Sequence, residues 1–171
     1  NKTIVIKNIQ VFNDPKFQYE NIFFCNEIIT KFNYSNLFKE LILVEEIKFK
    51  NPIIFLEIIE KEDSLIFEDN ISVLEKKEET YKPKVYPKKT KDKDIIFKTV
   101  KIINPKANIV LSKNYRYENI NISDMKFVNV GTSTSKSQHF KEIFKIFMSN
   151  IYFKIPDFEV QKKLKDIYIS K

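Results

Sequence analysis

Short runs of alternating apolar and polar residues occupy the first third of the chain. In Thr3–Phe12 the apolar positions change face after Ile6, which predicts a β-strand with a bulge near Lys7 and Asn8. In Ile22–Phe32 the apolar residues recur largely at every second position, which is the period of a strand. The chain is therefore expected to begin with two strands.

Two further apolar runs, Leu41–Phe49 and Ile53–Glu60, meet at Asn51 and Pro52. Because proline cannot donate a ladder hydrogen bond, the pattern predicts two strands joined by a tight turn or a bulged bend. The residues before them, Tyr34–Lys39, are expected to form a short helical turn.

The second half of the chain repeats the strand pattern after a short amphipathic helix. That helix is expected at Asn70–Glu78, with Asn70 as its N-cap residue. Three strands are predicted beyond it, and a change of face in the last of them predicts a bulge near Ser123 and Asp124. The three strands are Ile95–Ile103, Ala107–Leu111 and Asn119–Val130.

The clearest helix signal lies at Ser135–Phe153. Its apolar residues follow the i, i+3, i+4 spacing of one helix face, and Ser135 with Gln138 fits a capping box. This helix should cover one face of a sheet. Pro156 ends it, and Asp157 is expected to cap a final helix. The apolar positions of the long helix are Phe140, Ile143, Phe144, Phe147, Met148 and Ile151.

Together these elements predict an α+β fold. We expect a mainly antiparallel, twisted sheet that curves into a groove and is partly covered by a C-terminal amphipathic helix. Antiparallel pairing is expected because the strands follow one another over short turns, with no long helix between them before the C-terminal part. Residues 1–155 are expected to form one domain with an exposed lysine-rich loop at 79–94, and residues 156–171 a C-terminal helix.

Composition removes several classes of function. Of the 171 residues 43% are hydrophobic, which is enough for a core, and the single glycine excludes Gly-rich phosphate loops. One cysteine and one histidine exclude disulfide frameworks and Cys/His zinc sites. His139 is expected to be a polar residue at a helix start, and Cys25 a small core residue. No enzymatic activity, catalytic residue, metal site or cofactor is predicted.

Lysine dominates the positive charge. The net charge is +7, and residues 82–93 contain six lysines and a single aspartate. We expect this segment to be an exposed linker whose charge run is solvated, and its lysines are the candidates for contact with an anionic membrane surface. Lysines interleaved with tyrosines are also typical of RNA-binding loops, so an RNA contact stays open. The six lysines are Lys82, Lys84, Lys88, Lys89, Lys91 and Lys93.

Some of the predicted strands are apolar on both faces. Glu45 interrupts the apolar row of Leu41–Phe49, and the adjacent Glu46 is expected on the opposite face because neighbours in a strand alternate. Either helices cover the second apolar face, or the sheet forms a groove with an apolar wall that holds acyl chains. The candidates for that wall are Leu41, Leu43, Ile47, Phe49 and Phe55.

Four segments of the chain resemble the AsmA-like family of Gram-negative envelope proteins. The first strand ends in the turn NDPKF (Asn13–Phe17), similar to a turn of that family. Ile28–Ile58 resembles its succession of strand, short turn, strand, proline and strand. Phe97–Leu111 is similar to its strand pair around a turn, and Asn121–Met148 to its strand, polar stretch and amphipathic helix. The resemblance covers nearly all of residues 3–150.

The resemblance implies a periplasmic, non-enzymatic protein that is anchored to the inner membrane by a segment absent from this chain. It implies a role in lipid binding or transfer or in outer-membrane homeostasis, with phospholipid acyl chains as partners. A small relative with a single β-groove, or a fragment, fits the length of the chain. No stretch of the sequence approaches the roughly 20 apolar residues of a transmembrane helix.

Two other functions stay open at this point. One is a nucleic-acid-associated or ribonucleoprotein subunit that uses the lysine-rich loop and Arg116, although no specific nucleic acid is expected. The other is a structural subunit of a larger assembly, which would expose a large apolar patch without bound lipid. The sequence does not indicate an oligomeric state.

Overall fold

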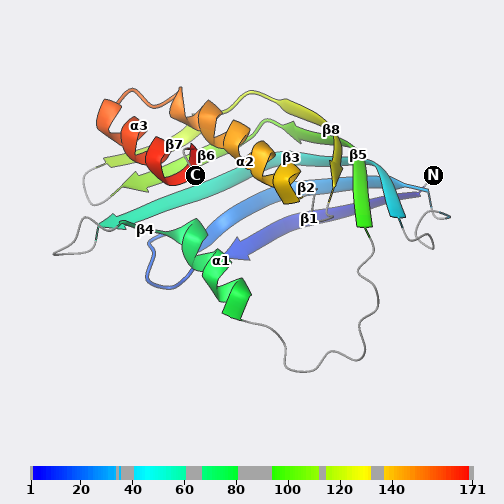
Figure 1. The fold of residues 1–171 in the computed structure, drawn as a ribbon, viewed down its shortest axis with the longest axis horizontal. Coiled ribbons are helices and arrows are strands. Elements are labelled where there is room, and N and C mark those ends of the chain that lie inside the picture. The colour runs from blue at the N-terminus through cyan, green and yellow to red at the C-terminus, as the bar shows by residue number, and fades with distance from the viewer. Residues whose placement is uncertain are drawn as a thin grey trace.

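The computed structural model consists of an open, curled sheet with helices packed on one of its faces (Figure 1). Residues 2–33, 35, 41–60, 67–80, 94–111, 115–131 and 137–169 are described. The α+β class is confirmed. In chain order the elements are β1 (Lys2–Phe12), β2 (Asn21–Phe32), β3 (Leu41–Glu60), β4 (Phe67–Asp69), α1 (Asn70–Thr80), β5 (Asp94–Ile103), β6 (Lys106–Leu111), β7 (Tyr115–Asn121), β8 (Met125–Gly131), α2 (Ser137–Tyr152), α3 (Phe158–Leu164) and the π-helical turn η2 (Lys165–Ile169).

Strand β3 is the centre of the sheet, and it adds two parallel pairings to the mainly antiparallel sheet that the sequence predicts. Five of the seven strand pairings in the described residues are antiparallel, but β3 pairs in parallel with β5 and with β6. The sheet is therefore mixed. A parallel crossover needs a dozen or more residues. Residues 61–93 supply them, and α1 within that stretch is helical, so β5 starts beside the beginning of β3, with Asp94 opposite Leu41.

Seven of the eight strands form five long ribbons, and the short β4 pairs with the end of β3. β5 and β6 follow β3 in a single register, because Ile103 lies opposite Lys50 and Lys106 lies opposite Ile53. β8 and β7 run back antiparallel along that pair, with one register shift between β6 and β7 at Ala107–Ile109. β3 itself is one strand of 20 residues, so two separate strands were wrongly predicted there. The alternative of a bulged bend describes Asn51 better, since its φ is 51°.

A row of asparagines crosses these ribbons. Asn8, Asn51 and Asn104 have φ angles of 54°, 51° and 51°, and the strand registers align them, with Asn26 between the first two. The Nδ2 of Asn104 donates to the Oδ1 of Asn51 at 2.8 Å. Asparagine tolerates the left-handed region better than other residues with a Cβ. Because the chain has only one glycine, asparagine occupies these backbone positions with positive φ.

Side chains change face at this asparagine row. Ile122 is buried and Met125 packs against the same core, although the two are three residues apart and would face opposite ways in a regular strand. The bulge predicted near Lys7 and Asn8 is replaced by a residue with positive φ, and the strand predicted at Asn119–Val130 is divided into β7 and β8 at residues 122–124. The register between β1 and β2 stays continuous at Asn8, and its shift lies between Val11 and Phe12 instead.

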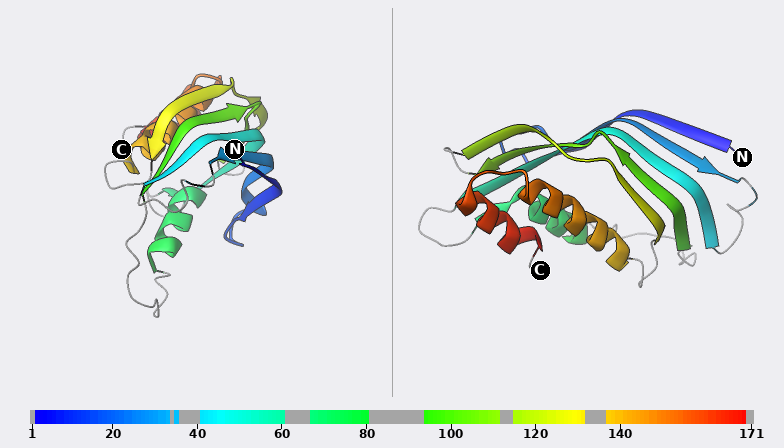
Figure 2. Two further views of the ribbon diagram at one scale, coloured as in Figure 1. Left: turned by 90° about the vertical axis from the view of Figure 1, so that its right-hand side faces the viewer. Right: turned by 90° about the horizontal axis from the view of Figure 1, so that it is seen from above.

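The core lies between one face of the sheet, here called the helix face, and the C-terminal helices (Figure 2). Residues from β3, β6, α2, α3 and η2 share one buried cluster, so residues 156–169 pack into the same core as the sheet. The Oδ1 of Asp157 accepts a hydrogen bond from the amide of Val160 at 3.1 Å, which confirms the predicted cap. Central members of the cluster are Leu56, Ile58, Ala107, Ile109, Met148, Ile151 and Leu164.

The cap of α1 differs from the prediction. Asp69 accepts hydrogen bonds from the amide and the hydroxyl of Ser72, at 2.9 and 2.7 Å. Asn70, the expected cap, is fully buried and pairs with β3 instead: its Oδ1 accepts from the amide of Glu57 and its Nδ2 donates to the carbonyl of Phe55. Asn70 therefore continues the edge of β3 like a short piece of strand.

Three predictions fall on residues outside the described ranges. These are the helical turn at Tyr34–Lys39, of which only Ser35 is described, the capping residue Ser135, and the lysines of residues 82–93. None of the described helices is long and apolar enough to span a membrane.

Candidate functional site

Apolar side chains continue along the helix face beyond the helices. Two rows of directly paired residues cross the sheet from β1 to β8, and paired residues of neighbouring strands share a face. Met125 ends one row and packs against the helical core, so both rows lie on the helix face. The rows are Ile4, Thr30, Ile47, Val100 and Phe127, and Ile6, Ile28, Phe49, Ile102 and Met125.

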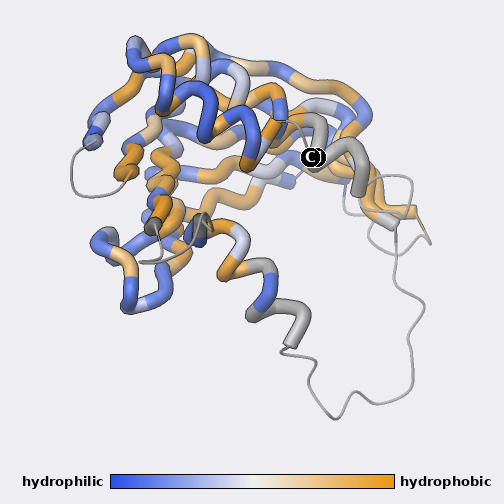
Figure 3. The backbone as a smooth tube through the Cα atoms, turned by 60° about the vertical axis from the view of Figure 1, so that its left-hand side comes forward, coloured by the Kyte–Doolittle hydropathy of each residue, from blue (hydrophilic) through white to orange (hydrophobic). Residues whose placement is uncertain are grey.

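The exposure of these rows increases away from α2. Helix α2 contacts β8, which is at the opposite edge of the sheet from β1. Val100 on β5 is only 5% exposed, whereas Ile4 and Ile6 on β1 are 48% and 51% exposed. Figure 3 shows hydrophobic residues recurring along the strands. We call the uncovered part, formed by Ile4, Ile6, Ile28, Ile47 and Phe49, the open apolar strip.

The strip contains two of the five predicted groove residues, Ile47 and Phe49. The register between β2 and β3 shifts opposite Glu45, and this β-bulge moves Leu41 and Leu43 to the opposite face. Phe55 also lies opposite the helix face, since it alternates with the core residue Leu56. Its ring packs against Tyr19 with the ring centroids 4.9 Å apart.

Sequence reasoning missed Ile4, Ile6 and Ile28 as members of the strip. Their alternation was visible in the sequence, but alternation alone does not reveal which face the helices cover. The strip emerges only from the cross-strand pairing of β1 and β2 with β3.

Glu45 and Glu46 are not an acid/base pair. The register between β2 and β3 shifts opposite Glu45, and the two carboxylates have separate lysine partners. Glu45 forms an ion pair with Lys98 at 2.8 Å, and Glu46 binds Lys101 and Lys31. The hydrogen bond from Lys101 holds the pKa of Glu46 below its usual range. Both carboxylates are therefore engaged in ion pairs with lysines.

A buried carboxylate fixes the segment between β1 and β2. Glu57 on β3 is 2% exposed. Its oxygens accept hydrogen bonds from the amides of Gln18 and Tyr19, at 2.7 and 2.6 Å, and from the Nδ2 of Asn13 at 3.2 Å. Three donors compensate for the desolvation of the charge. These hydrogen bonds to Glu57 hold the segment that contains the NDPKF turn, which carries part of the family resemblance, against the central strand of the sheet.

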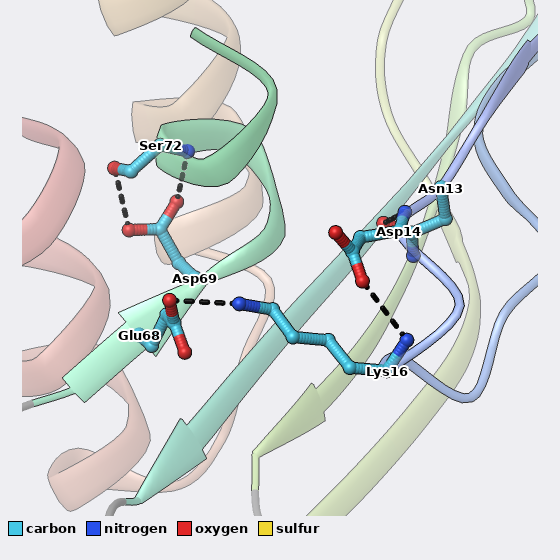
Figure 4. A network of polar contacts seen from close by, with 6 residues as sticks. All are labelled: Asn13, Asp14, Lys16, Glu68, Asp69 and Ser72. Carbon is cyan, nitrogen blue, oxygen red and sulfur yellow. Dashed lines mark hydrogen bonds and ion pairs between the residues drawn. The ribbon is translucent and has the colours of Figure 1, made fainter. Parts of the chain in front are cut away.

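Further polar contacts extend this anchor to the helices (Figure 4). Lys16 forms an ion pair with Glu68 of β4 at 2.8 Å. The neighbouring Asp69 caps α1 and also accepts from the hydroxyl of Tyr168 at 3.0 Å. The network joins the turn between β1 and β2, strand β4, helix α1 and the C-terminal turn η2. Its contacts hold these elements together.

A small hollow lies beside this network, between Phe12, Ile22, Asn70 and Leu74, with a volume of about 50 Å³. Pockets that enclose small molecules typically measure about 300 to 1,000 Å³. The hollow is too small for an acyl chain, so the open apolar strip is the better candidate for an apolar ligand.

The side chains of Cys25 and Arg116 are engaged within the fold. Cys25 is fully buried with its Sγ 3.4 Å from the carbonyls of Glu27 and Lys50, and burial raises the pKa of its thiol. Arg116 donates from Nε to Glu118 at 2.6 Å and lies over the ring of Tyr19. His139 belongs to α2, as expected. Within the described ranges no group of three His, Cys, Asp or Glu residues could hold a metal ion.

The fold and the site define a class: an α+β protein with a mixed, curled sheet whose helix face is only partly covered. The chain matches no family model, no curated protein and no solved structure.

Proposed function

We propose that the protein is a non-enzymatic envelope protein that binds lipid acyl chains on the open apolar strip. The observation that carries the proposal is the exposure of Ile4 and Ile6, which continue a row of half-buried apolar residues out of the core. An acyl chain laid along the strip would remove apolar surface from water at about 25 cal/mol per Å². The strip would form one wall of the groove that we propose for the curled sheet.

The resemblance to AsmA-like proteins supports the rest of the proposal. It supplies the periplasmic location, the anchor to the inner membrane in a segment outside this chain, and the role in lipid transfer or outer-membrane homeostasis. The lysines of residues 82–93 contact the anionic membrane surface. In fractionated cells the full-length protein should be found in the inner membrane with this domain accessible to periplasmic protease. Recovery in the cytosol would contradict this part of the proposal.

Two neighbouring residues of β1 allow a matched test of the strip. Ile6 and Val5 are 51% and 48% exposed but lie on opposite faces of the strand. The variant Ile6→Asp places a charge in the strip, and the control Val5→Asp places the same charge outside it. We expect Ile6→Asp to reduce the uptake of a fluorescent phospholipid severalfold, and Val5→Asp to leave it unchanged.

Native mass spectrometry of the gently purified wild-type protein provides the second measurement. Bound lipid is expected in the wild type and less of it in Ile6→Asp, while both variants keep the thermal midpoint of the wild type. A clean apo mass together with no phospholipid uptake would overturn the lipid-binding function. Equal loss of uptake in both variants would show that the strip is not the site.

A further inference from the structure

The sheet face opposite the helices carries a dense set of lysines. One row of directly paired residues on this face consists of Val5, Ile29, Lys48, Lys101 and Lys126. Three lysines therefore stand side by side on three adjacent strands. Like charges directly opposite each other destabilise a sheet, so folding alone does not favour this arrangement.

The neighbouring carboxylates compensate for this charge only in part. Five lysines gather around two glutamates on this half of the face: Lys31, Lys48, Lys50, Lys101 and Lys126 around Glu27 and Glu46. We call these five lysines the lysine face. Glu46 alone is shared by Lys31, Lys48 and Lys101. The face therefore keeps an excess of positive charge.

The lysines also stand further out than the carboxylates. The side chain of Lys31 is 50% exposed and that of its partner Glu46 is 14% exposed. Lys50 and Glu27 show the same order, at 42% and 23%. The carboxylates lie close to the sheet, and the lysine stems carry their ammonium groups towards solvent. An approaching surface would meet positive charge first.

We infer that the lysine face is a docking surface for an anionic lipid bilayer. The excess ammonium groups match the charge of phosphate head groups. On the same face the exposed Val128, at 64%, lies two residues from Lys126 along β8. Nucleic-acid surfaces typically use arginine and stacked aromatic rings. The lysine row contains neither. The inference extends the proposed function with a membrane contact that is separate from the apolar strip.

Vesicle co-sedimentation at low salt tests this docking surface. The full chain is mixed with vesicles of phosphatidylcholine alone or of phosphatidylcholine with phosphatidylglycerol. The triple variant Lys48→Gln, Lys101→Gln and Lys126→Gln should lose binding to the anionic vesicles on the order of 100-fold, from about fivefold per lysine near the surface. The triple arginine variant at the same positions keeps the charge and should bind like the wild type.

A matched control removes the same charge elsewhere. Lys154, Lys162 and Lys165 are exposed around α3, away from the lysine face. Their change to glutamine should leave vesicle binding within about twofold of the wild type. A loss of binding equal to that of the lysine-face variant would overturn the inference, because binding would then follow net charge alone. A loss seen only when the lysines of residues 82–93 are neutralised would overturn it as well.

Two further readouts separate this inference from its alternatives. Phospholipid uptake by the lysine-face variant should equal that of the wild type, so a failure of the docking surface and a failure of the apolar strip are distinguishable. Binding of the wild type to a single-stranded RNA homopolymer but not to anionic vesicles would overturn the inference in favour of a nucleic-acid surface. If the glutamine variant does not fold, as judged by circular dichroism, the single variant Lys126→Gln should still weaken vesicle binding about fivefold.

Discussion

Single carboxylates in this protein take their properties from cross-strand lysines. Hydrogen bonds from Lys50 and Lys101 hold the pKa values of Glu27 and Glu46, respectively, below their usual range. In the unfolded chain both groups return to about 4.3. A carboxylate whose pKa is lower in the folded state stabilises that state above the unfolded pKa, and the contribution is lost as the pH falls through the folded pKa.

The first prediction concerns this acid dependence. The urea midpoint should decrease as the pH is lowered below about 4.3, because Glu27 and Glu46 become protonated and lose their bonds to lysine. The double variant Glu27→Gln and Glu46→Gln should show a smaller decrease over the same range, since its neutral amides do not titrate there. An identical decrease in variant and wild type would show that other groups cause the acid sensitivity.

At the scale of the strand, the asparagine row decides where a ribbon changes face. Asn51 and Asn26 are neighbours in this row, but only Asn51 has a positive φ, at 51°. Without a Cβ, glycine adopts such an angle freely, whereas alanine pays about 1 to 2 kcal/mol. In a regular strand the order is reversed, because glycine is less stable than alanine by about 0.5 to 1 kcal/mol.

The second prediction is that the order of stability of the glycine and alanine variants is reversed between Asn51 and Asn26. The free energy of unfolding should be higher for Asn51→Gly than for Asn51→Ala, by about 1 kcal/mol. Both variants lose the hydrogen bond from Asn104, so this loss cancels in the comparison. At Asn26 the alanine variant should be the more stable one. Chemical denaturation of the four variants measures the effect, and the same order at both positions would contradict it.

At the scale of the whole molecule, the C-terminal segment is part of the core. Leu164 of α3 is fully buried in the cluster that contains Leu56 of the central strand. The edge strand β1 contributes no residue to that cluster. We therefore expect α3 and the central strands to unfold together in one cooperative transition.

The third prediction tests this cooperation. Leu164→Ala should lower the free energy of unfolding by about 2 to 5 kcal/mol, because it leaves a cavity in the shared core. The nearby Phe158 is 71% exposed, and Phe158→Ala should change the stability by no more than about 0.5 kcal/mol. Thermal unfolding followed by circular dichroism in the strand region measures both. An unchanged strand transition in Leu164→Ala would show that α3 is an independent appendage.

The sequence by itself determined the features that depend on neighbouring residues. It predicted most of the strands from their period of two, α2 from its period of 3.6, and a cap at Asp157. It also indicated changes of face near Asn8 and Ser123–Asp124, although not their form. These features depend on the conformations that a residue and its close neighbours allow, so the local pattern carries them.

Only the tertiary structure decided how those elements combine. The sequence predicted neither the parallel pairing of β3 with β5 nor the burial of Glu57 and Asn70, because both depend on contacts between residues far apart in the chain. The residues of the open apolar strip also depend on contacts between distant parts of the chain. One bulge at Glu45 moves Leu41 and Leu43 away from Ile47 and Phe49, because a shift of one residue exchanges the two faces of a strand. Which side chains share the open apolar strip is thus set by register, and register is fixed by pairing across the whole sheet.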